Sequence, residues 1–364
     1  MRNIRISLLM IVLTLIAIGI VMIYSSTAIY GWEHFKDSGY FLKRHLVFLL
    51  IGFVFTALAM TIDYRILNRY AKPLVLLSAV MLVMVLAPGV GREVFGAKRW
   101  FRLFGLSFQP SEFANLAVII YVASFLSGKG SRRMDYFIFG FLPPIMVLGL
   151  VDILVLAEPD LGTAVALGTV VFIMLFVAGF RLRYLLYIGM CAIPLLYFLI
   201  FNVPYRRARI MSFLNPWADP LKSGFQLIQS QVAIGSGGLF GKGLGKSLQK
   251  LFYLPAGHTD FIFSLIGEEL GFFATLGVLF LFILLFIQGV RIMKYAQDAF
   301  GSLLSLGVIL LITLKAFINI GVSTGIFPTK GLPLPFISYG GSALIFDMVG
   351  VGLLLNVARF GENP

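Results

Sequence analysis

The sequence has few charged residues, one cysteine and three histidines, and each shortage excludes a class of protein. Charged residues make up 12% of the 364 positions, about half of the ~25% that is usual in soluble domains, which excludes an ordinary soluble enzyme. The single cysteine, Cys191, excludes an intrachain disulfide and a Cys-x-x-Cys metal site. The histidines, His34, His45 and His258, share no spacing that is typical of metal ligands.

Hydrophobic residues are abundant, at 59% of the chain, and the mean hydropathy is +0.97. Because one crossing takes about 20 apolar residues, this composition predicts a polytopic integral membrane protein. Apolar runs long enough to cross fall at 6–27, 45–62, 73–88, 111–127, 136–157, 161–179, 182–203, 261–290, 300–324 and 336–357. We therefore predict an all-α fold of ten transmembrane helices, in a single membrane domain over residues 1–364, with a long extracytoplasmic loop at about 204–260.

The distribution of Lys and Arg predicts which ends of the spans face the cytoplasm. With a cytoplasmic N-terminus, every inside segment carries basic residues, as the positive-inside rule requires. These residues are Arg2, Arg5, Arg65, Arg69, Lys72, Lys129, Arg132, Arg133, Arg181, Arg183, Arg291, Lys294 and Arg359. An even number of spans returns the C-terminus to the same side, so both termini are expected in the cytoplasm. The first apolar run, from Ile6 to Ile23, is longer than the core of a signal peptide, and we expect it to be retained.

The net charge of +13 would suggest nucleic-acid binding in a soluble protein, but in a membrane protein its division between the two faces is more informative, and no nucleic-acid partner is expected. Basic residues gather in two outer segments, 89–110 and 204–260. Long translocated loops can carry charge regardless of the positive-inside rule, which is one explanation. The other is that the seven cations of the longer segment, against only Asp219 and Asp260, attract an anionic group at the membrane face, such as a lipid phosphate.

The segment 204–260 is too long and too apolar for a flexible linker, and we expect it to fold as short interfacial helices. Pro216 and Pro220 punctuate its first part, and residues 235–245 are rich in glycine. The glycine run resembles a phosphate-cradling loop only loosely, because it lacks the Walker spacing. A tight turn between two interfacial helices is the alternative interpretation.

Eight ionisable side chains fall within the predicted spans or at their ends, where charge is costly and therefore often functional. They are Glu112, Asp152, Glu158, Asp160, Glu268, Glu269, Lys315 and Asp347. Glu112 and Asp160 also stand where helices begin, so helix capping explains them as well as function does. Lys315 and Asp347 have a structural alternative too, as two charges that neutralise each other between helices. Glu268 follows Asp260 by eight residues, about two helical turns, which predicts a small acidic stripe.

Several motifs taken together resemble one family. Residues 254–263 read LPAGHTDFIF, and residues 267–271 read GEELG. Further matching segments lie at 96–100, 109–113, 158–163, 215–239 and 331–342. With motifs in nearly all of the predicted spans, the chain is similar to the SEDS family of FtsW, RodA and SpoVE proteins. Residues 215–220 and 328–331 look more like FtsW, the division member, than RodA, the elongation member.

The resemblance implies a peptidoglycan glycosyltransferase that polymerises lipid II, an undecaprenyl-diphosphate-linked disaccharide peptide, on the outer face of the cytoplasmic membrane. It also implies a class B penicillin-binding protein as partner, with other proteins of a division or elongation complex. The essential aspartate of the family maps onto Asp260. A carboxylate there can take the proton from an attacking sugar hydroxyl, while a diphosphate leaves as a stable anion and needs cations rather than a second acid. We therefore expect Asp260 to act as general base in an inverting displacement.

Further site residues follow from residue type and from the resemblance. The candidates for diphosphate contact are Lys98, Arg99, Arg206, Arg207 and Lys246. Glu112 and Asp160 match family positions, where they would shape the cavity or hold a divalent cation, Mg²⁺ or Mn²⁺, through carboxylate oxygens. His258 would either position Asp260 or only cap its turn, and Lys330 would contact substrate or partner. The sequence specifies no complete set of metal ligands.

One residue departs from the family pattern. The family commonly has Lys three residues after Glu112, which gives an i, i+3 ion pair, whereas this chain has Asn115. Glu112 therefore either finds another cation or titrates differently.

Two other classes of function stay open. A lipid II flippase needs polar residues at several membrane depths, and Asp152, Lys315 and Asp347 favour it. A polymerase needs them gathered at one face, which Asp260 and the long basic loop favour. A non-catalytic scaffold for the penicillin-binding protein is the third hypothesis, and the intact motif around Asp260 argues against it. Within the family, the alternative to the division polymerase is a RodA-like elongation polymerase.

Overall fold

The computed structural model describes residues 1–94, 97–103, 106–128, 137–250, 254 and 257–361. Within these residues, nine helices are long and apolar enough to cross a membrane, and a tenth apolar helix, α7, has 17 residues. The ten helices are α1 (Arg2–Phe35), α2 (Tyr40–Thr61), α3 (Arg65–Leu86), α4 (Pro110–Ser127), α6 (Leu142–Ala157), α7 (Leu161–Val177), α8 (Leu182–Phe201), α11 (Ile262–Tyr295), α12 (Ala299–Thr324) and α13 (Gly341–Phe360). Each predicted span corresponds to one of them, so the predicted polytopic helical fold is confirmed.

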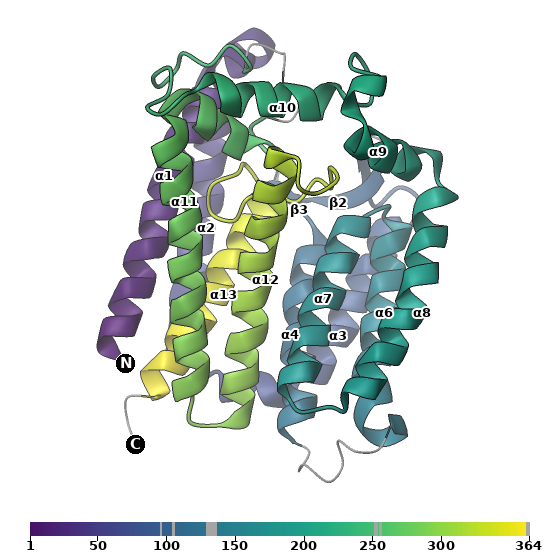
Figure 1. The fold of residues 1–364 in the computed structure, drawn as a ribbon. Coiled ribbons are helices and arrows are strands. Elements are labelled where there is room, and N and C mark those ends of the chain that lie inside the picture. Colours follow the sequence, from purple (N-terminus) through teal and green to yellow (C-terminus); the bar gives the residue numbers. More distant parts are fainter. Residues whose placement is uncertain (95–96, 104–105, 129–136, 251–253, 255–256, 362–364) are drawn as a thin grey trace.

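The helices form two groups that meet along α12 (Figure 1). In one group α13 packs on α2 and α11 packs on α1 and α12, while in the other α3 packs on α4 and α6 on α7. Contacts of α12 with α4 and α7 join the groups. Both termini lie at the same end of the bundle in Figure 1, as an even number of crossings requires.

Burial differs strongly between the helices. In α4, α12 and α13 most residues are buried, whereas Leu185 is the one buried residue of α8. The exposed side chains of α8 are large and apolar, among them Met190 and Ile193. Such a surface is stable only against lipid tails. Helix α12 lies in the centre of the bundle. It therefore connects the core with the end of the bundle that carries the long loop.

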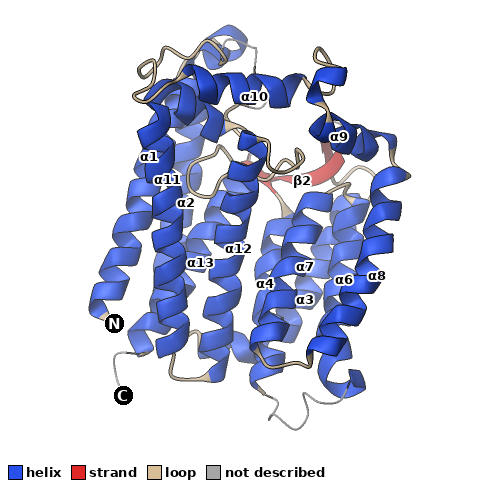
Figure 2. Ribbon diagram, in the orientation of Figure 1, coloured by secondary structure: helices blue, strands red, loops and turns tan. Residues whose placement is uncertain are grey.

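A small sheet lies at the end of the bundle opposite the termini (Figure 2). Its strands, β1 (Arg92–Val94), β2 (Ala97–Leu103) and β3 (Leu106–Phe108), pair antiparallel in the order β1-β2-β3. The all-α prediction missed this element, because β1 and β3 have only three residues each and the seven residues of β2, AKRWFRL, do not alternate between apolar and polar. The sheet precedes α4 directly and brings Arg99 to the end of α6.

The long loop contains the short helices that its apolar residues predicted. They are α9 (Pro204–Leu214), the 3₁₀ turn η2 (Pro216–Ala218) and α10 (Phe225–Ser236), and a π-helical turn, η1 (Phe137–Phe141), precedes α6. A proline opens α9 and η2, where its missing N–H costs no hydrogen bond. In Figure 1, α10 lies across the end of the bundle rather than along it, as expected of an interfacial helix.

Helix α11 is broken at Gly271, whose φ of 80° and ψ of −172° are not helical. The glycine-rich segment after α10 lies against this break and bonds the freed backbone groups: Phe272 N donates to Gly238 O (2.9 Å) and Lys242 N to Glu268 O (2.9 Å). A Cβ on Gly271 would lie 2.3 Å from Gly241 N, so only glycine fits. The glycine run is therefore a tight structural segment, as the turn interpretation predicted. In the described residues it packs on α11, and no second interfacial helix follows it before α11.

Candidate active site

Five segments converge at the end of the bundle that carries the long loop. Arg99 comes from β2, Asp160 from the α6–α7 turn, Arg209 from α9, Lys330 from the α12–α13 loop, and Asp260 from the turn that precedes α11. The loop between α12 and α13 makes the central contacts, because its residues touch the other segments. A carboxylate is thus surrounded by cations drawn from positions far apart in the sequence.

Asp260 is half-buried, and Gly331 lies close enough that a Cβ there would be 3.3 Å from Asp260 Oδ2. Burial raises the pKa of Asp260 to about 6, the positive charge of Arg209 and the Thr259 hydroxyl lower it, Asp160 raises it and Arg99 lowers it. At neutral pH the carboxyl group is therefore mostly ionised while remaining more basic than an ordinary aspartate. Both properties suit a general base.

Arg209 is the cation with the largest effect on the pKa of Asp260, and the sequence analysis did not select it. It donates to Thr329 O (3.2 Å) and stacks over the ring of Tyr205 at 4.4 Å. Arg206 lies on the same face of α9 and donates to Leu199 O (3.1 Å), whereas Arg207 is exposed. The i, i+3 spacing of Arg206 and Arg209 was the signal that was available in the sequence.

Arg99 holds the turn between α6 and α7. Its guanidinium donates to Glu158 O (2.7 Å) and Pro159 O (2.6 Å), and one nitrogen lies 3.6 Å from Asp160 Oδ2. Lys98 is the next residue on β2 and so points to the opposite face of the strand. Of the two, Arg99 is the one that the structure brings to the acidic turn.

The two carboxylates of the α6–α7 turn have different environments. Asp160 is the N-cap of α7, with its Oδ1 accepting from Thr163 N (3.1 Å), so the capping interpretation is confirmed while Oδ2 still faces Arg99. Glu158 is buried, and neither of its carboxyl oxygens has a hydrogen-bond partner among the described residues. Burial and the charge of Asp160 raise the pKa of Glu158 to about 8, against a smaller lowering by Arg99. Glu158 is therefore mostly protonated at neutral pH.

Lys330 lies beside the site, whereas Lys246 does not contact it. The backbone of Lys330 packs on Gly162 at the start of α7, where a Cβ would lie 3.0 Å from Lys330 O, and burial lowers the pKa of the ammonium. Lys246 is exposed and forms no ion pair within the described part of the chain.

His258 is packed among aromatic rings, with ring centroids 5.6 Å from Phe41, 6.0 Å from Tyr339 and 6.3 Å from Tyr30. Burial lowers its pKa to about 4, so the imidazole is neutral at physiological pH. These contacts favour a packing role in the turn that carries Asp260 over a role in acid–base chemistry.

Glu112 has found another cation. Lys315 Nζ of α12 lies 2.6 Å from Glu112 Oε2 of α4 and 3.2 Å from Asp347 Oδ1 of α13, and all three side chains are buried. The predicted neutralisation between Lys315 and Asp347 is confirmed, with Glu112 as a third member. Glu112 thus takes its cation from a different helix instead of from position 115 on its own helix, and its position is explained by this buried cluster.

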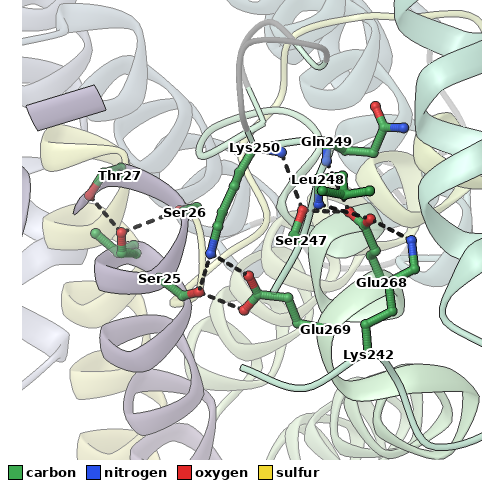
Figure 3. Close-up of polar contacts among 11 residues, drawn as sticks. Ser25, Ser26, Thr27, Lys242, Ser247, Leu248, Gln249, Lys250, Glu268 and Glu269 are labelled. Carbon is green, nitrogen blue, oxygen red and sulfur yellow. Dashed lines mark hydrogen bonds and ion pairs between the residues drawn. The ribbon is translucent and has the colours of Figure 1, made fainter. Parts of the chain in front are cut away.

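The predicted acidic stripe is wrong (Figure 3). Asp260 precedes the first residue of α11, so helical periodicity does not apply to it, and Glu268 and Glu269 are each occupied by a lysine. Glu268 accepts hydrogen bonds from Lys242 Nζ (2.9 Å), Leu248 N (3.1 Å) and Ser247 Oγ. Glu269 accepts from Lys250 Nζ (3.0 Å) and Ser25 Oγ (2.6 Å). These buried pairs fix the glycine-rich segment to α11 and α1.

The described residues contain no group of three or more His, Cys, Asp or Glu side chains that would hold a metal ion by themselves. Mg²⁺ usually binds one or two carboxylates together with substrate phosphates. Asp160, at the α6–α7 turn beside the site, is the carboxylate that would supply this share.

Comparisons with known proteins agree with this architecture. The sequence profile of the FtsW/RodA/SpoVE cell cycle proteins matches residues 6–363. A probable peptidoglycan glycosyltransferase FtsW of Geobacter sulfurreducens is 47% identical over 351 residues, which cover 96% of this chain and 94% of the relative. The stage V sporulation protein E of Bacillus subtilis is 43% identical over 355 residues, 98% of this chain and 97% of that protein.

Solved structures show the same fold. A chain of a peptidoglycan synthase complex that coordinates polymerization and crosslinking superposes with a TM-score of 0.79 at 31% identity, covering 98% of both chains. The rod shape determining protein RodA of Thermus thermophilus superposes with a TM-score of 0.72 at 30% identity, covering 98% of this chain and 97% of RodA. This chain belongs to the FtsW/RodA/SpoVE family.

Proposed function

We propose that this protein is a peptidoglycan glycosyltransferase that polymerises lipid II into glycan strands during cell division. The observation that carries the proposal is Asp260, a half-buried and basic carboxylate faced by Arg209 and Arg99 at the end of the bundle where the long basic loop lies. The names of its relatives, peptidoglycan glycosyltransferases of the FtsW type, support the same activity and favour division over elongation.

In the proposed reaction Asp260 is the general base. It accepts the proton of the acceptor sugar hydroxyl as that oxygen forms a bond to the anomeric carbon of the donor. The bond from this carbon to the diphosphate breaks, and its electron pair leaves with undecaprenyl diphosphate. A single displacement of this kind inverts the donor carbon.

The negative charge that develops on the leaving diphosphate needs cations. Arg209 and Arg99 are the first candidates because both act electrostatically on Asp260, while Lys330 on the adjoining loop and Arg206 on α9 would add to them. The three arginines would exchange their backbone contacts for phosphate oxygens. A divalent cation, Mg²⁺ or Mn²⁺, would supply further charge, with Asp160 as its protein ligand and the diphosphate completing its coordination. Arg207, Lys98 and Lys246 are left with the more general role of attracting the anionic substrate.

The expected partner is a class B penicillin-binding protein, which would cross-link the strands within a division complex. The similarity to a chain of a peptidoglycan synthase complex supports this partnership. We place the protein in the cytoplasmic membrane, with both termini in the cytoplasm, because the basic residues of the short connecting loops then obey the positive-inside rule. The site around Asp260 then faces outward, where lipid II is consumed.

The test is polymerisation of purified lipid II in detergent with Mg²⁺ or Mn²⁺, alone and with a co-purified class B penicillin-binding protein. Asp260→Asn keeps the shape of the side chain and removes the base, so we expect at least a 100-fold loss of rate with unchanged folding and partner binding. Asp219→Asn is the matched control, because Asp219 lies in the same loop and its carboxylate bonds only Ser223 among the described residues. Undiminished polymerisation by Asp260→Asn would refute the assignment.

The flippase alternative makes a different prediction for the same preparations. Two of the residues that favoured it, Lys315 and Asp347, are bound to each other in the buried cluster, where Lys315 also binds Glu112. If no polymer forms even with the partner, translocation of lipid II in proteoliposomes becomes the decisive measurement.

A further inference from the structure

Three consecutive carbonyl groups on the turn that carries Asp260 are each held by a hydrogen bond from α12 or from the α12–α13 loop. Tyr339 N donates to His258 O (3.0 Å), Ser338 Oγ donates to Thr259 O, and Asn319 Nδ2 donates to Asp260 O (2.9 Å). Because the carbonyl of Asp260 itself is bonded by a side chain, one substitution can release it.

Asn319 is a residue of α12 with 2% of its surface exposed. Its Nδ2 also donates to Leu332 O (2.7 Å), so one amide group links the turn before α11 to the loop after α12. Both partners are carbonyl oxygens, which can only accept, so the amide orientation is fixed by chemistry. A buried asparagine that uses both hydrogens in this way holds two backbone segments in one register.

The second segment also borders the carboxylate. Leu332 follows Gly331, and a Cβ on Gly331 would lie 3.3 Å from Asp260 Oδ2. Asn319 therefore fixes the backbone of Asp260 and the wall against which its carboxylate rests. Its hydrogen bonds among the described residues go to these two carbonyls and not to the carboxylate.

We propose that Asn319 is a positioning residue for Asp260. By donating to the carbonyls of both Asp260 and Leu332, it holds the general base in the position required for the reaction. The inference rests on the proposed function, since it needs Asp260 to act in the reaction. Removing the amide leaves two carbonyls without a donor and frees the turn to shift. A displacement of about 1 Å at a reacting group costs on the order of 100-fold in rate.

The pH profile separates this role from a merely structural one. Burial keeps the pKa of Asp260 near 6 against the lowering by Arg209 on α9 and Arg99 on β2, while Asp160 in the α6–α7 turn raises it. Lys330 lies on the adjoining loop, and the neighbouring His258 is neutral. A turn released from Asn319 becomes more hydrated, so the pKa of Asp260 should fall toward its ordinary value. The acid limb of kcat/KM would then move to lower pH.

The experiment compares full-length Asn319→Leu, Asn319→Ser and Asn319→Asp in lipid II polymerisation over pH 5–8.5. Leu removes both hydrogen bonds at similar volume, Ser keeps one donor, and Asp keeps the shape but turns an acceptor toward two carbonyls. We expect kcat to fall about 10- to 100-fold in Asn319→Leu, less in Asn319→Ser and at least as much in Asn319→Asp, with KM for lipid II within about twofold. The acid limb should move down in Asn319→Leu.

Asn356 provides the matched control. It is a buried asparagine of α13 at the opposite end of the bundle, whose Nδ2 shares its two hydrogens among Ala59 O (2.9 Å), Met60 O (3.0 Å) and Ile62 O (2.7 Å) and whose Oδ1 accepts from Tyr64 N (3.2 Å). Asn356→Leu should lose stability as Asn319→Leu does, measured by thermal unfolding in detergent, while the folded fraction keeps the wild-type kcat and pH profile. If Asn319→Leu does not fold, the comparison of Asn319→Ser with Asn356→Ser decides.

Each outcome bears on the proposal. Equal kcat per folded molecule in the Asn319 and Asn356 variants, or an unmoved acid limb, would overturn the positioning role while Asp260→Asn, still inactive, left the proposed function intact. Polymerisation by Asp260→Asn would overturn the base assignment and the positioning role with it. A loss in Asn319→Ser as large as that in Asn319→Leu would show that a retained donor makes no difference, and would also overturn the proposal.

Discussion

Replacing Arg209 with Gln should move the acid limb of the pH profile upward, because Arg209 is the cation with the largest lowering effect on the pKa of Asp260. Gln keeps much of the side-chain length and a donor for Thr329 O, which Arg209 bonds at 3.2 Å. The change therefore removes charge with little loss of packing. Removing an opposite charge near a carboxyl group typically raises its pKa by about 1 unit or more.

The size of the effect follows from the starting value. With a pKa of about 6, half of the Asp260 carboxyl groups are ionised at pH 6. With a pKa raised to about 7, roughly one tenth would be ionised at pH 6 and about nine tenths at pH 8. We therefore expect kcat/KM of Arg209→Gln to be about fivefold lower at pH 6 and nearly unchanged by this cause at pH 8, relative to wild type.

The assay is the initial rate of lipid II polymerisation at low substrate concentration between pH 5 and 8.5. Arg209→Lys is the control, since it keeps the positive charge and should leave the acid limb within about 0.3 units of wild type. A uniform loss at every pH would assign Arg209 to diphosphate binding alone. An acid limb that moves to lower pH would refute the electrostatic reasoning outright.

Two further changes test the parts of the fold that hold the site. Lys315→Met leaves Glu112 and Asp347 buried without their cation and should destabilise the protein by about 3–5 kcal/mol. Thermal unfolding should show that adding Glu112→Gln and Asp347→Asn recovers part of this stability. No recovery would contradict the charge argument. Gly271→Ala places a Cβ 2.3 Å from a backbone nitrogen at a φ of 80°, and should lower the unfolding temperature and expose the long loop to limited proteolysis. Gly277→Ala, on the same helix with open space around it, should be neutral or stabilising.

The spans were predictable because a membrane imposes a strong and local signal. A run of about 20 apolar residues has few other meanings, and the short helices of the long loop were visible in the same way. The sheet was not predictable, since β1 and β3 have three residues each and the seven residues of β2 do not alternate between apolar and polar. The break in α11 lies inside one apolar run and leaves no local signal. The backbone groups that form hydrogen bonds around Gly271 come from the separate segment 237–243.

Charge alone was a poor guide to which polar residues belong to the site. Glu268 and Glu269 form ion pairs with Lys242 and Lys250 and are not free to bind a ligand. These pairs join separate segments, so no local sequence pattern predicts them. Arg206 and Arg207 were predicted from their position in a basic loop. The rotation of α9 about its axis determines instead that Arg209 reaches the loop beside Asp260. That rotation depends on where the helix begins, which the sequence defines only to within a few residues.

One polar face of α12 makes contacts both in the core and at the site around Asp260. Lys315 and Asn319 are four residues apart, so they lie on the same face about 6 Å apart along the helix axis. Lys315 bonds Glu112 and Asp347 in the buried cluster, and Asn319 bonds the carbonyls of Asp260 and Leu332. The buried cluster fixes the rotation and depth of α12 against α4 and α13, and the depth of α12 fixes where Asn319 meets the turn before α11. The position of the Asp260 carboxylate is therefore set from inside the membrane as well as by the loops that surround it.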